Sequence, residues 1–333
     1  MNKPLKYAVF GAGSWATAIV KMLCENLDEV GWYMRSVYTK EHLLREYHNP
    51  NYLSSVEFHI NQLKLSNDIN EIANYADVLI FVIPSAFIHA ELQKMNVDIS
   101  NKIIVSAVKG IIPETGLLVG EHFHEEYKIP YNDIAVIAGP CHSEEVALER
   151  LSYLTISCSD AKKAQTIANA LSSDYIKTKI SDDIIGVEYA VMLKNIYAIA
   201  AGIAHGLGYG DNFQSVLMSN SIREMKRFIK KMHKMKRNIN NSAYLGDLLV
   251  TGYSVFSRNR MFGNMIGKGY TVKSAQMEMS MVAEGYYATK SAHLLNEKNK
   301  SKTKLPIINA VYDILYEGKD PKKTFKKLTD KLD

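Results

Sequence analysis

The chain has 333 residues, enough for about two domains if a domain holds roughly 100–200 residues. Its composition is 47% hydrophobic, 23% charged and 10% aromatic, which excludes a disordered chain, a collagen or a coiled coil. Forty basic and 35 acidic residues give a net charge of +5. This mild excess suits an anionic small molecule as well as a nucleic acid, and it excludes neither.

The cysteines and the apolar runs indicate the compartment. There are three cysteines, Cys24, Cys141 and Cys158, and no CxxC pair, which argues against a disulfide framework or a zinc ribbon. No apolar run approaches ~18 residues, and the apolar stretch Tyr7–Phe10 is too short for the core of a signal peptide. We therefore expect a cytoplasmic protein without integral membrane contact.

The first half of the chain alternates short apolar runs with helical stretches. The runs are Tyr7–Phe10, Val78–Ile83, Ile103–Val108 and Ile134–Ala138. Continuous β-branched runs are typical of strands buried on both faces of a parallel sheet. Their alternation with helices predicts a doubly wound Rossmann fold. Such sheets bind ligands just beyond the carboxyl ends of the strands, where glycine-rich and polar residues stand in this sequence.

The second half changes character after about Gly186. Segment 187–205 is rich in alanine, contains no proline and is apolar nearly all round, so we predict a buried helix. Segments 213–236, 272–296 and 305–316 also have helical patterns. The sequence therefore predicts an α/β domain over residues 1–186, followed by an all-α domain over residues 187–333.

A glycine motif follows the first predicted strand directly. Gly11, Gly13 and Ala16 form G-x-G-x-x-A at the start of a helix. Gly11 permits the tight turn, Gly13 lets a pyrophosphate approach the backbone, and Ala16 keeps helix and strand close. The motif predicts dinucleotide binding, with a simple tight turn as the alternative.

The end of the second strand bears on which dinucleotide binds. A carboxylate for the ribose 2′-hydroxyl is expected about 20 residues beyond the motif, but Gly31–Met34 is followed by Arg35. Because arginine can pair with a 2′-phosphate, we expect NADP to be favoured, or at least accepted beside NAD. The alternative is that Arg35 is a solvated surface residue.

Two groups in the second half carry charge suited to catalysis. Lys194, beside Asn195 in the apolar helix, is either a proton donor to a carbonyl substrate or half of an interdomain salt bridge. Ser257-Arg258-Asn259-Arg260 is either a phosphate clamp or a solvated basic loop.

A basic segment, 226–237, holds seven lysine or arginine residues in twelve. Met225, Phe228, Met232 and Met235 recur at helical spacing within or beside it, so we expect a solvated amphipathic helix. Contact with a membrane surface or with nucleic acid is the alternative. The histidines and cysteines show no ligand spacing, and we expect no metal site.

With these residues in hand, the chain resembles the bacterial-type NAD(P)-dependent glycerol-3-phosphate dehydrogenases over nearly its whole length. The resemblance rests on eight blocks in order. They are GAGSWATA (11–18), VKGI (108–111), AGP (138–140), LKNIYAIAAGI (193–203), GLGYGDN (206–212), LGDL (245–248), SRNRMFG (257–263) and VAEG (282–285).

The resemblance implies a role for each matching position. Ser14, Trp15, Arg35, Ser143, Arg258 and Glu284 would contact the cofactor, together with the glycine motif. Lys109 would lie between cofactor and substrate. Lys194 would be the proton donor or acceptor, and Asp247 would hold Lys194 and the substrate in place. Gly139, Cys141, Ser257, Arg258 and Asn259 would contact the substrate. The family commonly has serine at position 141, alanine at 143 and Arg-Gly at 220–221, where this chain has Cys141, Ser143 and Asn220-Ser221.

The activity that the resemblance implies is reversible reduction of dihydroxyacetone phosphate to sn-glycerol 3-phosphate, which feeds glycerophospholipid synthesis. It implies no metal and no nucleic acid, and a homodimer is compatible with it. One alternative is a related β-hydroxyacid dehydrogenase acting on a carboxylate. Another is a protein that senses NADP without turnover.

Overall fold

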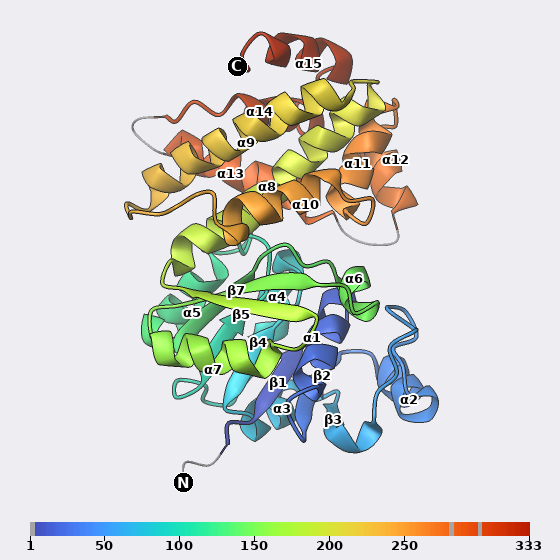
Figure 1. Ribbon diagram of the computed structural model, residues 1–333, viewed down its shortest axis with the longest axis vertical. Coiled ribbons are helices and arrows are strands. Elements are labelled where there is room, and N and C mark those ends of the chain that lie inside the picture. Colours follow the sequence, from blue (N-terminus) through green and yellow to red (C-terminus); the bar gives the residue numbers. More distant parts are fainter. Residues whose placement is uncertain (1–3, 280–282, 299–301) are drawn as a thin grey trace. The chain divides into compact units, whose positions relative to one another are not determined.

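The computed structural model describes residues 4–279, 283–298 and 302–333 (Figure 1). The chain forms two compact units. The first comprises Met1–Val108 and Leu117–Ile184, and the second comprises Lys109–Gly116 and Ile185–Asp333. The sequence pattern predicts one boundary near residue 186 and gives no sign that Lys109–Gly116 joins the second unit.

The first unit is built on an eight-stranded sheet of order β3-β2-β1-β4-β5-β6-β7-β8. The strands are β1 (Tyr7–Phe10), β2 (Val30–Tyr33), β3 (Leu63–Ser66), β4 (Val78–Phe81), β5 (Ile103–Ser106), β6 (Ile134–Ala138), β7 (Ser152–Cys158) and β8 (Ile176–Ser181). All neighbouring strands are parallel except β6 and β7. The predicted doubly wound fold is confirmed.

Two predicted strands were too long. β4 and β5 end two residues before the apolar runs 78–83 and 103–108 do, with Phe81 paired to Ser106 at the end of the ladder. Ile83 and Val108 are nevertheless buried. The apolar pattern therefore reports burial, which continues into the loops beyond the strands.

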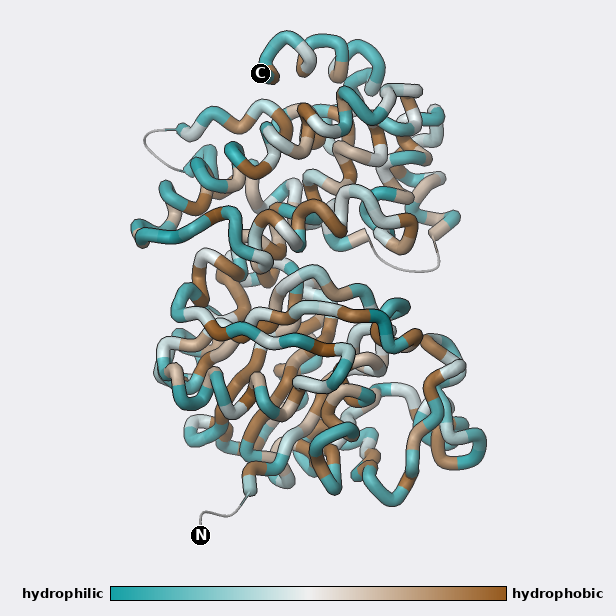
Figure 2. The backbone as a smooth tube through the Cα atoms, in the orientation of Figure 1, coloured by the Kyte–Doolittle hydropathy of each residue, from teal (hydrophilic) through white to brown (hydrophobic). Residues whose placement is uncertain are grey.

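Helices cover both faces of this sheet, whose strands are mostly hydrophobic (Figure 2). They are α1 (Ser14–Cys24), α2 (Val37–Glu46), α3 (Ile69–Tyr75), α4 (Ser85–Leu92), α5 (Val119–Tyr127), α6 (Ser143–Ala147) and α7 (Ala161–Leu171). The strand order reverses direction at β1, so right-handed crossovers place α1 and α3 on opposite faces. The carboxyl ends of β1 and β4 flank this switch point, which is where such sheets bind ligands.

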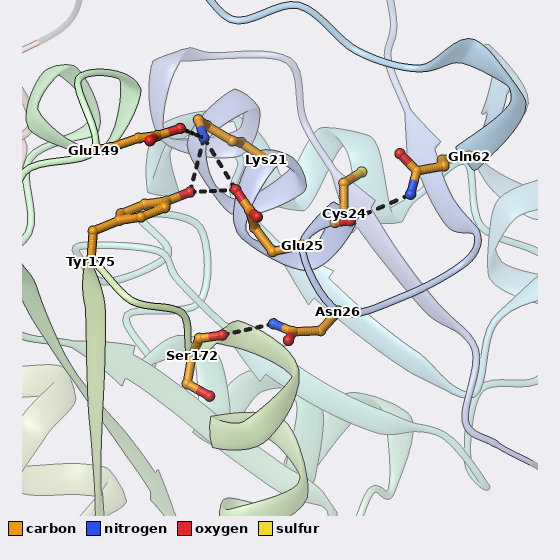
Figure 3. A network of polar contacts seen from close by, with 8 residues as sticks. All are labelled: Lys21, Cys24, Glu25, Asn26, Gln62, Glu149, Ser172 and Tyr175. Carbon is orange, nitrogen blue, oxygen red and sulfur yellow. Dashed lines mark hydrogen bonds and ion pairs between the residues drawn. The ribbon is translucent and has the colours of Figure 1, made fainter.

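A polar network anchors the far end of α1, the helix that follows the glycine motif (Figure 3). The Lys21 ammonium donates to the Glu149 carboxylate at 2.8 Å, to the Tyr175 hydroxyl at 2.9 Å and to Glu25 at 3.3 Å. The Tyr175 hydroxyl also donates to Glu25 at 2.9 Å. Because these partners come from the segments after α6 and before β8, the network ties α1 to the β7–β8 side of the unit.

The second unit is helical. Its elements are α8 (Ile184–Gly206), α9 (Asp211–Met232), a π-helical turn (Ser242–Gly246), α10 (Asp247–Tyr253), α11 (Arg258–Gly267), α12 (Val272–Glu278), α13 (Glu284–Lys298), α14 (Pro306–Leu315) and α15 (Pro321–Thr329). By length and composition α8 could cross a membrane, but 94% of its apolar window is buried inside the protein. The prediction of a buried core helix is confirmed.

Two helix predictions need correction. α9 ends at Met232 rather than near residue 236, because Met235 is the one apolar residue among the next five and leaves no face to bury. Segment 272–296 is not one helix, since α12 ends at Glu278 and α13 begins at Glu284. Part of the link between them, residues 280–282, lies outside the described residues. Up to Met232, α9 is the predicted amphipathic helix, with Met225 and Phe228 buried.

Glycines let three helices of the second unit touch backbone to backbone. A Cβ on Gly263 of α11 would lie 2.1 Å from the Ile199 carbonyl oxygen of α8. A Cβ on Gly202 of α8 would lie 2.0 Å from the Arg260 carbonyl oxygen, and one on Gly285 of α13 would lie 2.6 Å from that of Asn195. No side chain fits at these positions. These three glycines therefore allow α11 and α13 to pack directly against α8, the helix that carries Lys194.

A buried carboxylate caps α14. Both oxygens of Glu224, on α9, accept backbone N–H groups at 2.9 Å, from Ile307 and Ile308. The helix begins with Pro306, which has no N–H, so Glu224 satisfies the next two donors of the first turn. Burial raises the pKa of Glu224 to about 7, while the two backbone hydrogen bonds oppose this rise.

Candidate active site

In the first unit, the glycine motif forms an open cradle at the start of α1. Gly11 has φ +128°, and its Cβ would lie 3.0 Å from the Val82 carbonyl oxygen, so glycine is required there. Gly13 is the N-cap of α1 without a side-chain cap, and a Cβ on it would meet nothing within 4 Å. The first turn of α1 contains no acidic residue. This arrangement of partly exposed backbone at the positive end of a helix fits a pyrophosphate.

The residues that follow the motif pack as predicted for such a turn. Ser14 and Ala16 are buried and Trp15 is half-buried. The indole N–H of Trp32, on β2, donates to the Gly11 carbonyl at 2.7 Å and fixes the turn from below.

At the end of β2, Arg35 stands beside a carboxylate that the sequence analysis missed. Its side chain is 76% exposed, and its Nη1 lies 3.8 Å from Oε1 of Glu91. Glu91 comes from α4, more than fifty residues further along the chain. The local sequence pattern around Arg35 does not predict that Glu91 lies beside it.

Beyond β6 lie three further predicted contacts. Gly139 has φ +123°, and its Cβ would lie 2.5 Å from the Tyr153 carbonyl oxygen. Cys141 is buried. Ser143 begins α6 and its hydroxyl donates to the Glu144 carboxylate at 3.0 Å. All three stand at the carboxyl edge of the sheet, on the loop side expected for ligand contact.

In the second unit, Lys194 and Asp247 form a buried ion pair. The Lys194 ammonium, 5% exposed, donates to Oδ1 of Asp247, which is 2% exposed. Asp247 is the first residue of α10, directly after the π-helical turn, and its carbonyl accepts the Thr251 hydroxyl at 2.6 Å. From the sequence pattern, an interdomain salt bridge is the alternative role for Lys194. That alternative is wrong, because the partner lies in the same unit.

Lys109 and Glu284 extend this charged cluster. Burial, and then the charge of Lys194, lower the pKa of Lys109 to about 8, against the opposing charges of Glu284 and Asp247. Burial raises the pKa of Glu284, while Lys109, Arg258 and Lys194 oppose the rise. The second unit therefore holds predicted residues from five separate segments within electrostatic reach of one another.

The start of α11 is a structural junction. Ser257 is its N-cap, and its hydroxyl oxygen accepts the Arg260 N–H at 3.3 Å. The buried Asn259 accepts the Gly285 N–H at 2.9 Å and so fixes the first turn of α13, where Glu284 stands. Arg258, which stands between Ser257 and Asn259 in the sequence, is half-buried.

Asn195 is a candidate that the sequence analysis mentioned without assigning a role. Its Nδ2 is buried and has no hydrogen-bond partner among the described residues. A buried, unsatisfied donor is costly unless a ligand completes it. The sequence feature that points to Asn195 is a polar amide beside Lys194 in an otherwise apolar helix.

Within the described residues, no group of three or more His, Cys, Asp or Glu side chains is arranged to hold a metal ion. Lys109 and Lys194 are electropositive groups that the second unit can offer to a carbonyl or alkoxide oxygen.

Two family models match this chain, one in each half. Residues 6–164 match the family model described as NAD-dependent glycerol-3-phosphate dehydrogenase N-terminus, and residues 183–326 match the corresponding C-terminus model. The chain is 34% identical to a glycerol-3-phosphate dehydrogenase [NAD(P)+] of Oceanobacillus iheyensis, over 98% of this chain and 94% of that protein. It is also 34% identical to one of Macrococcus caseolyticus, over 98% of each. A crystal structure of glycerol-3-phosphate dehydrogenase from Coxiella burnetii superposes with a TM-score of 0.89, at 28% identity over 98% of both chains.

Proposed function

Because this chain belongs to the NAD-dependent glycerol-3-phosphate dehydrogenase family, we propose that it catalyses the reversible reduction of dihydroxyacetone phosphate to sn-glycerol 3-phosphate with NAD or NADP. The observation that carries the proposal is the buried Lys194–Asp247 pair beside Lys109. A buried ammonium held by a carboxylate is suited to give a proton to an alkoxide.

The first unit holds the cofactor in this proposal. Gly11, Gly13 and the N-terminus of α1 bind the pyrophosphate, and Arg35 faces the adenosine ribose. Ser14, Trp15 and Ser143 complete the contacts from this unit, and the family resemblance assigns Glu284 and Arg258 to cofactor contact as well. The nicotinamide supplies the hydride when the cofactor is bound.

The second unit supplies the proton and the charge. As hydride reaches the ketone carbon of the substrate, Lys194 protonates the oxygen that becomes an alkoxide. Asp247 orients Lys194 through their hydrogen bond, and Lys109 stabilises the same developing negative charge. Ser257, Arg258 and Asn259 bind the polar groups of the substrate, and the family resemblance assigns Gly139 and Cys141 to substrate contact as well. Binding of the phosphate, remote from the reacting carbon, helps to orient the carbonyl.

We also propose that the enzyme acts in the cytoplasm and supplies glycerophospholipid synthesis, without nucleic acid or integral membrane contact.

A steady-state assay tests the proposed reaction. Purified protein is expected to oxidise NADPH or NADH when dihydroxyacetone phosphate is added, and not when a short keto acid is added. Preference for the keto acid would instead identify a β-hydroxyacid dehydrogenase. Binding of NADPH without oxidation in the presence of either substrate would identify a sensing protein.

The charge on Lys109 predicts how the reaction depends on pH. Below about pH 8 Lys109 is protonated and can stabilise the alkoxide, and as the pH rises through about 8 that charge is lost. We expect kcat/KM for dihydroxyacetone phosphate to fall over the same range. A Lys109→Arg variant, whose guanidinium stays charged, is expected to move that fall to higher pH. A fall that stays near pH 8 in this variant would show that another group titrates.

A further inference from the structure

The end of β2 lacks the carboxylate that dinucleotide-binding folds often place there, but α4 provides one nearby. The Glu91 side chain is 7% exposed. Its Oε2 accepts the Tyr33 hydroxyl at 2.8 Å, and its Oε1 accepts the Lys94 ammonium at 2.8 Å. Tyr33 is the last residue of β2, so the carboxylate is fixed to the end of that strand.

Arg35 lies against this carboxylate and open to solvent. Its Nη1 is 3.8 Å from the same Oε1 that accepts Lys94. Among the described residues, Glu91 is the one ion-pair partner of Arg35. Burial alone would raise the pKa of Glu91, but the hydrogen bonds from Lys94 and Tyr33, together with the charges of Lys94 and Arg35, hold it below its usual value. Glu91 is therefore ionised at neutral pH.

The turn that follows α4 is also fixed by hydrogen bonds to a neighbouring helix. The Asn70 side chain, at the start of α3, donates to the Lys94 carbonyl at 3.1 Å and accepts the Asn96 N–H at 2.8 Å. The turn after α4 is thereby tied to α3. Glu91 stands one residue before the end of α4, just ahead of this fixed turn.

We propose that Glu91 is a specificity-determining residue for the cofactor, because its charge competes with a ribose 2′-phosphate for Arg35 and so limits the preference for NADP over NAD. The inference rests on the proposed function, in which Arg35 faces the adenosine ribose. A 2′-phosphate carries roughly −1.5 to −2 charges near neutral pH, and a fixed carboxylate close to its arginine partner repels it. The 2′-hydroxyl of NAD is uncharged and is not repelled.

The test is the binding of NADP⁺ and NAD⁺, each titrated by calorimetry, to the Glu91→Gln variant. Glutamine keeps the shape of the side chain and an oxygen to accept the Tyr33 hydroxyl, but removes the charge. We expect the Kd of NADP⁺ to fall about fivefold, the upper range for one partly exposed charge pair, with the Kd of NAD⁺ unchanged. The ratio of KM values for NADPH and NADH should shift in the same direction.

Glu71→Gln is the matched control. Glu71 accepts a hydroxyl, from Ser66 at 2.6 Å, and pairs with Lys64 at 3.0 Å, as Glu91 does with Tyr33 and Lys94, but no arginine pairs with it in the described part of the chain. This control is expected to leave both Kd values unchanged.

A second variant covers the case in which Glu91→Gln does not fold. Lys94→Gln removes the cation that partly neutralises Glu91, so it should weaken NADP⁺ binding and leave NAD⁺ binding unchanged. Equal shifts for the two cofactors, or no shift, in the variants that fold would overturn the role of Glu91. A wild-type protein that binds neither cofactor, or that reduces no dihydroxyacetone phosphate, would instead overturn the proposed function.

Discussion

A Lys194→Met variant is expected to lose about 10²–10⁴-fold in kcat, the range that a positioned general acid contributes. Methionine keeps an unbranched chain in the buried position on α8 but cannot give a proton to the alkoxide oxygen. The measurement is steady-state reduction of dihydroxyacetone phosphate at saturating cofactor. A kcat close to that of the wild type would remove Lys194 from the role of proton donor.

The same substitution leaves the buried Asp247 without the ammonium that it accepts. Removing one partner of a buried ion pair costs about 3–5 kcal/mol of stability, so loss of activity has to be separated from loss of fold. The double variant Lys194→Met/Asp247→Leu replaces both charges with apolar side chains. We expect chemical denaturation to show recovered stability, while kcat remains low. If kcat recovered with stability, the single variant would have reported unfolding only.

A Gly263→Ala variant is expected to have the second large effect, here on stability. The new Cβ would lie 2.1 Å from the Ile199 carbonyl oxygen, a backbone atom that cannot turn aside. Forcing α8 and α11 apart should cost about 3 kcal/mol, the upper part of the range for overpacking, and alanine's better helix propensity returns up to about 1 kcal/mol. Denaturation in urea measures the net loss. Because α11 begins at Arg258, we also expect a higher KM for the substrate.

Gly252→Ala is the control for Gly263→Ala. Gly252 also lies inside a helix, α10, but a Cβ there would meet the Met218 sulfur at 2.7 Å, near the end of a flexible side chain. We expect a clearly smaller loss of stability than at Gly263. Equal losses would mean that glycine matters at Gly263 for some reason other than the contact between backbones.

The parts of this structure that could be predicted are those that local pattern determines. β-Branched runs mark the buried strands, and an alanine-rich apolar segment marks α8. Lys194 was noticed because an ammonium in such a helix requires a partner. The identity of that partner could not be read from periodicity, since Asp247 is 53 residues away and follows a π-helical turn. The resemblance to a family, and not the pattern, named it.

Other features depend on contacts between distant elements. Glu91 reaches Arg35 only because α4 packs beside the end of β2, and sequence position gives no sign of this. The break between α12 and α13 was missed because apolar residues continue at helical spacing through segment 272–296. Periodicity shows which residues are buried, and it does not show where the chain turns.

The return of Lys109–Gly116 to the helical unit has a consequence for dissecting the enzyme. The polypeptide passes between the two units three times, after Val108, after Gly116 and after Ile184. A fragment that begins at Ile185 would retain Lys194 and Asp247 but would lack Lys109. The residues of the catalytic cluster are therefore not contiguous in the sequence. No single truncation can separate Lys109 and Lys194 together from the nucleotide-binding unit.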